Sequence, residues 1–190
     1  RDAFRGNELA GKVLGIVGMG RVGSQVAEFG RAFRMSVVAF DPLLDDWAPD
    51  VGRARSIEDL VRRAEVVSIH LLLDDATKGL FGRGVISAMR RGSWLVNTSR
   101  GEIVNELALA ESLARGHLAG AAVDVLADEH DGERRGSSPL LDYARQHDNL
   151  IITPHVAGAT VESMRRTEEF MAQQVLELHG RASGPREGSR

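Results

Sequence analysis

The fold is decided by the stretch Val13-Leu14-Gly15-Ile16-Val17-Gly18-Met19-Gly20-Arg21-Val22-Gly23. Its first five residues are a short apolar run, which is typical of a strand buried on both faces of a parallel sheet. The last six have the spacing G-x-G-x-x-G, and apolar residues then recur at helical intervals as far as Phe33. The stretch therefore predicts a strand, a tight turn and a helix, in that order.

The glycine spacing gains meaning from Asp41, which follows Gly23 by eighteen positions at the end of the next predicted strand. This arrangement is typical of dinucleotide binding: Gly18 permits the turn, Gly20 lets a pyrophosphate approach, and Gly23 lets the helix pack closely. Asp41 is expected to accept hydrogen bonds from the adenosine ribose and to repel a 2′-phosphate, which favours NAD over NADP. The alternative is that Asp41 is a solvated turn residue before Pro42.

Beyond this stretch the pattern alternates between short apolar runs and helical periodicity, with a capping-box spacing between Ser56 and Asp59. We expect an α/β fold of the Rossmann type, a doubly wound parallel sheet of six or so strands with helices on both faces. The predicted strands after the first are Val37 to Phe40, Val66 to Leu71, Trp94 to Asn97, Ala119 to Val125 and Leu150 to Thr153. The predicted helices are Ser56 to Ala64, Val85 to Met89 and Glu106 to Arg115.

A last helix is predicted from about Thr160 to His179, and it precedes a polar tail. One face of this helix carries an apolar stripe that calls for a partner surface. The stripe consists of Val161, Met164, Met171, Val175 and Leu178. We expect one dinucleotide-binding domain over residues 1–179 and a disordered tail over 180–190.

Composition narrows the function classes. The chain has 190 residues, of which 43% are hydrophobic and 27% charged, with a net charge of −3. This balance argues against a nucleic-acid surface, and no apolar run approaches the ~20 residues of a membrane helix. The absence of cysteine excludes disulfides, thiolate catalysis and cysteine-bound metals, and it fits a cytoplasmic location. No metal site is expected.

Three polar residues follow later predicted strands, where open parallel sheets bind their ligands. They are Arg100 after the strand ending at Asn97, Asp124 within the strand ending at Val125, and His155 after the strand ending at Thr153. Each also has an ordinary explanation: a surface arginine at a helix start, a strand-end cap and a buried structural histidine.

At this point the sequence resembles the D-2-hydroxyacid dehydrogenases over nearly its whole length, from about Phe4 to Thr167. Besides the glycine motif, the resemblance is carried by Asn97-Thr98-Ser99-Arg100-Gly101, by Gly116-His117-Leu118-Ala119-Gly120-Ala121-Ala122-Val123-Asp124-Val125, and by Thr153-Pro154-His155-Val156-Ala157-Gly158-Ala159-Thr160. The resemblance implies NAD as cofactor and a small 2-oxo or 2-hydroxy acid as substrate. Homodimers are common in this family.

The resemblance also implies a catalytic triad. Arg100 would bind the substrate carboxylate, His155 would donate or accept a proton, and Glu129 would hydrogen-bond to His155. A carboxylate beside an imidazole keeps the imidazole protonated for ketone reduction. The family has Glu-Pro where this chain has Glu129-His130, so Asp128 is an alternative to Glu129; the spacing of twenty-nine residues from Arg100 favours Glu129.

Further cofactor contacts follow from the resemblance, residue by residue. Arg21 and Val22 would lie at the pyrophosphate, Thr98 and Ser99 beside the nicotinamide, Asp124 on the carboxamide and Gly158 near the ring. His70 is a candidate for the cofactor wall, or else a buried strand-end histidine. The family's His-x-Pro is here His70-Leu71-Leu72, so a rigid proline at the adenine edge is lost.

Members of this family have a second, substrate-binding domain built mainly from residues upstream, and this chain is expected to lack most of it. The isolated chain is therefore expected to bind NAD but to turn over poorly. Two alternatives keep the fold and change the function. An NAD-sensing corepressor-like binding protein retains the triad, and formate dehydrogenase has glutamine in place of the triad glutamate, which Glu129 argues against.

Overall fold

The computed structural model describes residues 6–44, 46–127, 129 and 137–182. The chain divides into two compact units, Arg1–Pro154 and His155–Arg190, and each is described here by itself. The predicted Asp128 and most of the acidic stretch that contains it lie outside the described residues.

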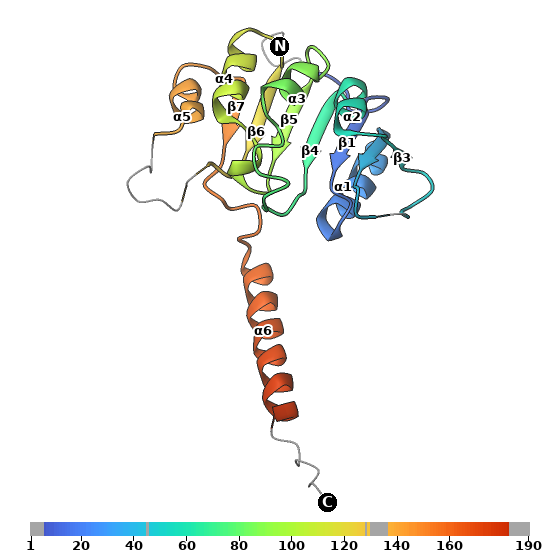
Figure 1. The fold of residues 1–190 in the computed structure, drawn as a ribbon, viewed down its shortest axis with the longest axis vertical. Helices are drawn as coiled ribbons and strands as arrows, with labels where there is room; N and C mark the ends of the chain where they lie inside the picture. The colour runs from blue at the N-terminus through green and yellow to red at the C-terminus, as the bar shows by residue number, and fades with distance from the viewer. Residues whose placement is uncertain (1–5, 45, 128, 130–136, 183–190) are drawn as a thin grey trace, which may run out of the picture. The chain divides into compact units, whose positions relative to one another are not determined.

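The first unit is built on one parallel sheet whose strand order is β3-β2-β1-β4-β5-β6-β7. Figure 1 shows the strands side by side, with β3 at one edge and β7 at the other. The order reverses between β1 and β4, which is the doubly wound arrangement. The strands are β1 (Val13–Val17), β2 (Ser36–Phe40), β3 (Gly52–Arg53), β4 (Val66–Ile69), β5 (Trp94–Asn97), β6 (Gly120–Val123) and β7 (Leu150–Ile152). The predicted Rossmann-type fold is confirmed.

Short helices connect these strands. They are α1 (Arg21–Ala32), α2 (Ile57–Arg63), α3 (Arg83–Ala88), α4 (Glu106–Ala114), α5 (Pro139–Ala144) and a 3-10 turn, η2 (Gly101–Ile103). The predicted strands and helices are present to within a few residues at their ends. The sequence patterns did not predict β3 and α5, which are only two and six residues long.

Side chains of the strands alternate between two cores, one on each face of the sheet. In β1, Leu14 and Ile16 join the core beneath α1, whereas Val17 joins the larger core beneath α2 to α5. Gly15 faces α2 so closely that an added Cβ would lie 2.6 Å from Leu60 Cδ2. The sheet is therefore buried on both faces at β1, as its apolar run predicts.

Helix α1 packs on the sheet through its small residues. Gly23, Ala27 and Gly30 are its buried residues. The larger Phe29 and Phe33, which share its helical spacing, are 62% and 60% exposed. At Gly30 a Cβ would lie 2.5 Å from Leu14 Cδ2, so this face of the helix has no room for larger side chains.

The face of β5 to β7 on the α1 side remains partly exposed. Leu95 and Leu150 point into the larger core, whereas their neighbours Trp94 and Ile151 are 46% and 61% exposed. The main contacts of α1 with the sheet are to β1 and β2. We call this apolar surface, which includes Trp94 and Ile151, the open sheet face.

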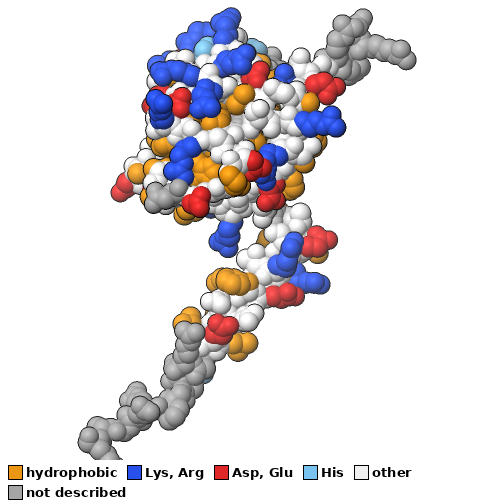
Figure 2. Space-filling view, turned by 90° about the vertical axis from the view of Figure 1, so that its right-hand side faces the viewer, with side chains coloured by type: hydrophobic (Ala, Val, Ile, Leu, Met, Phe, Trp, Pro, Cys, Tyr) orange, Lys and Arg blue, Asp and Glu red, His pale blue; other side chains and the backbone are white. Residues whose placement is uncertain are grey.

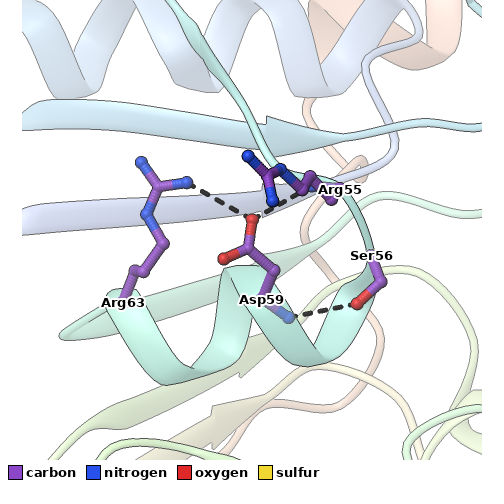
Figure 3. A network of polar contacts seen from close by, with 4 residues as sticks. All are labelled: Arg55, Ser56, Asp59 and Arg63. Atoms are coloured by element: carbon purple, nitrogen blue, oxygen red, sulfur yellow. Dashed lines mark hydrogen bonds and ion pairs between the residues drawn. The ribbon is translucent and has the colours of Figure 1, made fainter.

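Helix α2 begins with the predicted cap. Ser56 Oγ accepts a hydrogen bond from Asp59 N at 3.2 Å (Figure 3). The Asp59 carboxylate reaches back to Arg55 N at 3.0 Å, one residue before the cap, and the pKa of Asp59 is lowered mainly by this backbone N–H. The capping-box prediction is confirmed, except that the carboxylate binds the N–H of Arg55 and not that of the N-cap residue Ser56.

The second unit contains α6 (Val161–Ala182). The helix continues to Ala182, so the predicted end at His179 is three residues too early; residues 183–190 lie outside the described part. The predicted apolar stripe is exposed along its length, from 54% at Met164 to 83% at Val161. Among the described residues, no helix combines the length and apolar character that a membrane crossing requires.

Candidate cofactor and substrate site

The predicted site residues of the first unit gather at the carboxyl edge of the sheet because of the strand register. Val17 pairs with Phe40 and Ile69, Ile69 pairs with Asn97, and Asn97 pairs with Val123. The last residues of five parallel strands therefore form one row. The residue that follows each of them is a predicted site residue: Gly18, Asp41, His70, Thr98 and Asp124.

The glycine turn is shaped by backbone contacts. Gly18 has a φ of 92°, and a Cβ there would lie 2.3 Å from the carbonyl oxygen of His70. A Cβ on Gly23 would lie 1.9 Å from the Gly18 carbonyl oxygen. Neither position can hold a side chain, so these two glycines are required by the fold itself.

Gly20 differs from the other two. It is the N-cap residue of α1 and offers no side-chain cap, and an added Cβ would meet nothing within 4 Å. The helix thus presents its positive end and its first N–H groups, including those of Arg21 and Val22, to an open space. These features fit a pyrophosphate. Packing within the protein does not require a glycine at position 20, but a ligand that approaches the backbone closely would require one.

Asp41 is held against the glycine turn. Its Oδ2 accepts from Met19 N at 2.8 Å and its Oδ1 accepts from Leu43 N at 2.9 Å. It lines a hollow of about 450 Å³ whose walls are Phe40, Asp41, Pro42, Leu44, Trp47, Arg53, Ala54 and Arg55. The Arg53 guanidinium stacks 4.0 Å over the Trp47 ring. The carboxylate thus borders a cavity beside the turn and also fixes the turn.

His70 and Ser99 are engaged within the protein. His70 Nε2 lies 2.9 Å from Ser68 Oγ, and burial lowers the pKa of the His70 imidazole. Ser99 Oγ donates to Ile69 O at 2.7 Å and accepts from Leu71 N at 3.2 Å. Ser99 thus ties down the end of β4, whereas the role of His70, at the cofactor wall or as a structural histidine, stays a prediction.

The loop after β4 has a defined path without the family's proline. Its start is held by the bond from Leu71 N to Ser99 Oγ, and Thr77 Oγ1 donates to Leu72 O at 2.6 Å. Asp74 accepts from the N–H groups of Ala76 and Thr77 at 2.9 Å and closes the turn. Hydrogen bonds here restrict the backbone that a proline ring would otherwise restrict.

Arg100 is positioned by the buried Asn97. Asn97 Nδ2 donates to Arg100 O at 2.9 Å, and Asn97 Oδ1 accepts from Ser99 N at 3.0 Å. Arg100 Nη1 donates to Ser99 O at 2.7 Å, and the Arg100 side chain is exposed at the edge of the sheet, as is Thr98. An exposed guanidinium with a fixed backbone is well suited to bind a carboxylate.

Asp124 is 4% exposed and joins the last two strands. Its N–H donates to Asn97 O at 3.0 Å, and its Oδ1 accepts a hydrogen bond from Thr153 Oγ1. No role was predicted for Thr153 from the sequence. Its pairing with Asp124 spans twenty-nine residues, a distance at which no local pattern signals a contact.

Glu129 lies close to the end of β6. Its Oε2 accepts from Leu126 N at 3.3 Å. His155 and Gly158 belong to the second unit, and His155 has a φ of 54°, in the left-handed region that residues other than glycine seldom occupy. The first unit thus brings Arg100 and Glu129 to the edge that carries the candidate cofactor residues, and the pairing of either with His155 stays a prediction. No group of three or more His, Cys, Asp or Glu suited to a metal ion is found among the described residues.

Comparison with known proteins covers most of the chain. The sequence model of the D-isomer specific 2-hydroxyacid dehydrogenase NAD binding domain matches residues 1–157. D-3-phosphoglycerate dehydrogenase of Bacillus subtilis is 38% identical over 180 residues, which are 94% of this chain and 33% of that protein. Glyoxylate reductase of Aeropyrum pernix is 39% identical over 173 residues, which are 90% of this chain and 50% of that protein.

Among solved structures, D-lactate dehydrogenase of Aquifex aeolicus, complexed with NAD and lactic acid, is 29% identical with a TM-score of 0.81. The match covers 94% of this chain and 56% of that one. The chain therefore spans between about a third and just over half of the lengths of these relatives.

Gly23 is required by packing within the protein and Gly20 is not, so substitutions at the two positions should separate an effect on folding from an effect on NAD binding. Gly23→Ala should destabilise the chain by about 2 kcal/mol or more, since its Cβ meets backbone that cannot move aside. Gly20→Ala should keep the free energy of unfolding within about 1 kcal/mol of the unsubstituted chain, because helix ends tolerate alanine there at modest cost. It should nevertheless weaken NAD binding by about 10-fold or more, through loss of close backbone approach.

Urea unfolding and calorimetric titration with NAD measure the two effects. Equal loss of stability in both variants would contradict the division of roles between Gly20 and Gly23.

Proposed function

Because the chain belongs to the D-isomer specific 2-hydroxyacid dehydrogenase family and forms its NAD-binding domain, we propose that it serves an enzyme that interconverts 2-oxo acids and D-2-hydroxy acids. The observation that carries the proposal is the row of strand ends, which sets Arg100 on the same edge as the glycine turn and Asp41. A carboxylate-binding guanidinium beside a dinucleotide site suits an anionic substrate.

NAD, when bound, supplies or accepts the hydride at the substrate carbon. The residues of this chain would do the rest. The first N–H groups of α1 bind the pyrophosphate, Asp41 binds the adenosine ribose beside its hollow, and Asp124 and Thr98 lie toward the nicotinamide end of the edge. Arg100 binds the substrate carboxylate and orients the carbonyl, and His155 transfers the proton to or from the substrate oxygen. Glu129 orients His155 and favours its charged form.

The substrate itself is assigned only by class. Arg100 recognises the carboxylate that all 2-oxo acids share. The relatives contain further segments that this chain does not span. We assign the choice among 2-oxo acids to a second domain, which closes over the carboxyl edge and excludes water. A cytoplasmic location stays a prediction.

Cofactor selectivity gives the first test of this proposal. The chain should bind NAD at least about 10-fold more tightly than NADP, because a 2′-phosphate would be repelled by the Asp41 carboxylate. Asp41→Asn removes the charge and keeps an acceptor for Met19 N, so it should narrow the ratio chiefly by improving NADP binding. Calorimetry with both cofactors measures the ratio. Equal affinities in the unsubstituted chain would remove Asp41 from the ribose site.

The triad gives the second test, in the full-length protein with a panel of 2-oxo acids and NADH. His155→Ala should lower the reduction rate by about 100-fold or more and leave NAD affinity nearly unchanged. Glu129→Gln should move the upper pH limit of reduction to lower pH, because the imidazole loses its proton more easily without a neighbouring negative charge.

Asp128→Asn is the matched control for that assignment. A shift of the pH profile by Asp128→Asn and none by Glu129→Gln would move the role to Asp128. No reduction of any 2-oxo acid by the unsubstituted protein would favour the alternative of an NAD-sensing binding protein.

A homodimer is part of the proposal, since exposed apolar side chains occur on both units (Figure 2). Two surfaces compete for the contact, the open sheet face with Ile151 and the stripe of α6 with Val175. Sedimentation at about 50 μM, a concentration at which weak interfaces fill, should show a dimer. Ile151→Glu or Val175→Glu should dissociate it and thereby identify the surface. A monomer in the unsubstituted chain would contradict the dimer.

A further inference from the structure

We infer that Glu106 is a positioning residue that holds the peptide between Leu126 and Ala127, and through it the candidate triad residue Glu129. The inference rests on the proposed function for its catalytic consequence. Its structural basis is the set of contacts around that one peptide, all within the first unit.

Glu106 is the first residue of α4, and both of its carboxylate oxygens are engaged. Oε1 accepts from Ala127 N at 2.7 Å, and Oε2 accepts from Ser138 Oγ at 2.6 Å. The partners lie 21 and 32 residues away in the sequence. Hydrogen bonds to a carboxylate are stronger than those between neutral groups, and a carboxylate at a helix N-terminus is favoured by the helix dipole. Glu106 therefore fixes the chain on both sides of Glu129.

The consecutive N–H groups of Leu126 and Ala127 donate hydrogen bonds to two different carboxylates. Leu126 N donates to Glu129 Oε2 at 3.3 Å, and Ala127 N donates to Glu106 Oε1. Only the Cα of Leu126 separates the two amides, so the bond from Ala127 N to Glu106 restricts the two torsion angles of Leu126 that relate one planar peptide unit to the next. The direction in which Glu129 points thus depends on the bond made by Glu106.

The same peptide also touches the segment that carries Arg100. Gly101, which follows Arg100, lies so close to this peptide that an added Cβ would be 2.0 Å from Leu126 C and 2.2 Å from Ala127 N. Asn105 caps α4 by accepting from Ala108 N at 2.9 Å, which fixes the start of the helix that bears Glu106. One short run, Arg100 to Glu106, therefore presents Arg100 to the substrate and sets the position of Glu129 relative to it.

Ser138 completes the arrangement. Its hydroxyl donates to Glu106 and accepts from Leu140 N at 3.1 Å, so it caps α5 while it anchors the segment's far end. A side chain one methylene shorter than glutamate cannot reach both Ala127 and Ser138. A glutamine can, because its oxygen accepts from Ala127 N and its amide N–H donates to Ser138 Oγ.

The test compares three substitutions at Glu106 in the full-length protein. Glu106→Ala and Glu106→Asp should lower kcat for 2-oxo acid reduction by about 10-fold or more, through misplacement of Glu129. They should move the upper pH limit in the same direction as Glu129→Gln, with NAD affinity changed less than about twofold, since the glycine turn is not involved. Glu106→Gln should retain the pH profile and most of kcat.

Hydrogen exchange of the Ala127 amide in this chain, followed by NMR, tests the contact without any activity. Glu106→Ala should speed that exchange by about 10-fold or more, because a charged hydrogen-bond acceptor is lost. Glu111→Ala is the matched control: it removes the same charge from the same helix, where Glu111 pairs with Arg83 and Arg115 at the surface. It should alter neither the exchange of Ala127 nor the pH profile.

The outcomes separate the two claims. An Ala127 exchange rate in Glu106→Ala equal to that in Glu111→Ala overturns the inference, whether or not the enzyme is active. Faster exchange with an unchanged kcat and pH profile overturns the positioning role and leaves the proposed function standing. If Glu106→Ala does not fold, Glu106→Asp decides by the same readouts. An inactive unsubstituted protein would count against the proposed function, and the exchange arm would still decide the contact.

Discussion

Close backbone packing at Gly18 is the constraint on which the candidate site depends. The Gly18 carbonyl oxygen touches the position where Gly23 would carry a side chain, and Gly18 itself lies against the His70 carbonyl. These contacts bring β1, α1 and β4 together at one point, the place where the strand order reverses. Because the strands are parallel and in register, the residues that follow their carboxyl ends lie at that same edge of the sheet. The position of the candidate dinucleotide site thus follows from how the sheet is assembled.

Polar side chains at this edge act mainly on the protein backbone. Asp41 holds Met19, Ser99 holds the end of β4, Asn97 holds Arg100, and Glu106 holds Ala127. Each such bond gives a partner to a backbone group at or beyond a strand end. The first N–H groups of α1 lie at an open space, the Arg100 side chain is exposed, and the Asp41 carboxylate also borders its hollow. A rigid backbone with few presented groups suits the binding of an anionic cofactor and an anionic substrate.

Local sequence patterns predicted the parts that local chemistry determines. The glycine spacing located the turn from β1 to α1, and the eighteen-residue interval located Asp41 at the end of β2. The helical spacing did not indicate which residues are buried: Phe29 and Phe33 share that spacing and are exposed, whereas the buried residues of α1 are Gly23, Ala27 and Gly30. Glu106 and Thr153 could not be found from sequence, because their partners are more than twenty residues away. The two-residue β3 is too short to show a period at all.

Amide chemical shifts of the chain during titration with NAD test the central claim most directly, since they report where the cofactor binds. We expect the largest changes in Gly18 to Gly23 and in residues around the Asp41 hollow, such as Ala54 and Arg55. A second hollow, of about 500 Å³, is lined by Gly6 to Ala10 and Phe33 and should remain unchanged. Changes confined to that second hollow, or none at millimolar NAD, would contradict a cofactor site at the carboxyl edge of the sheet.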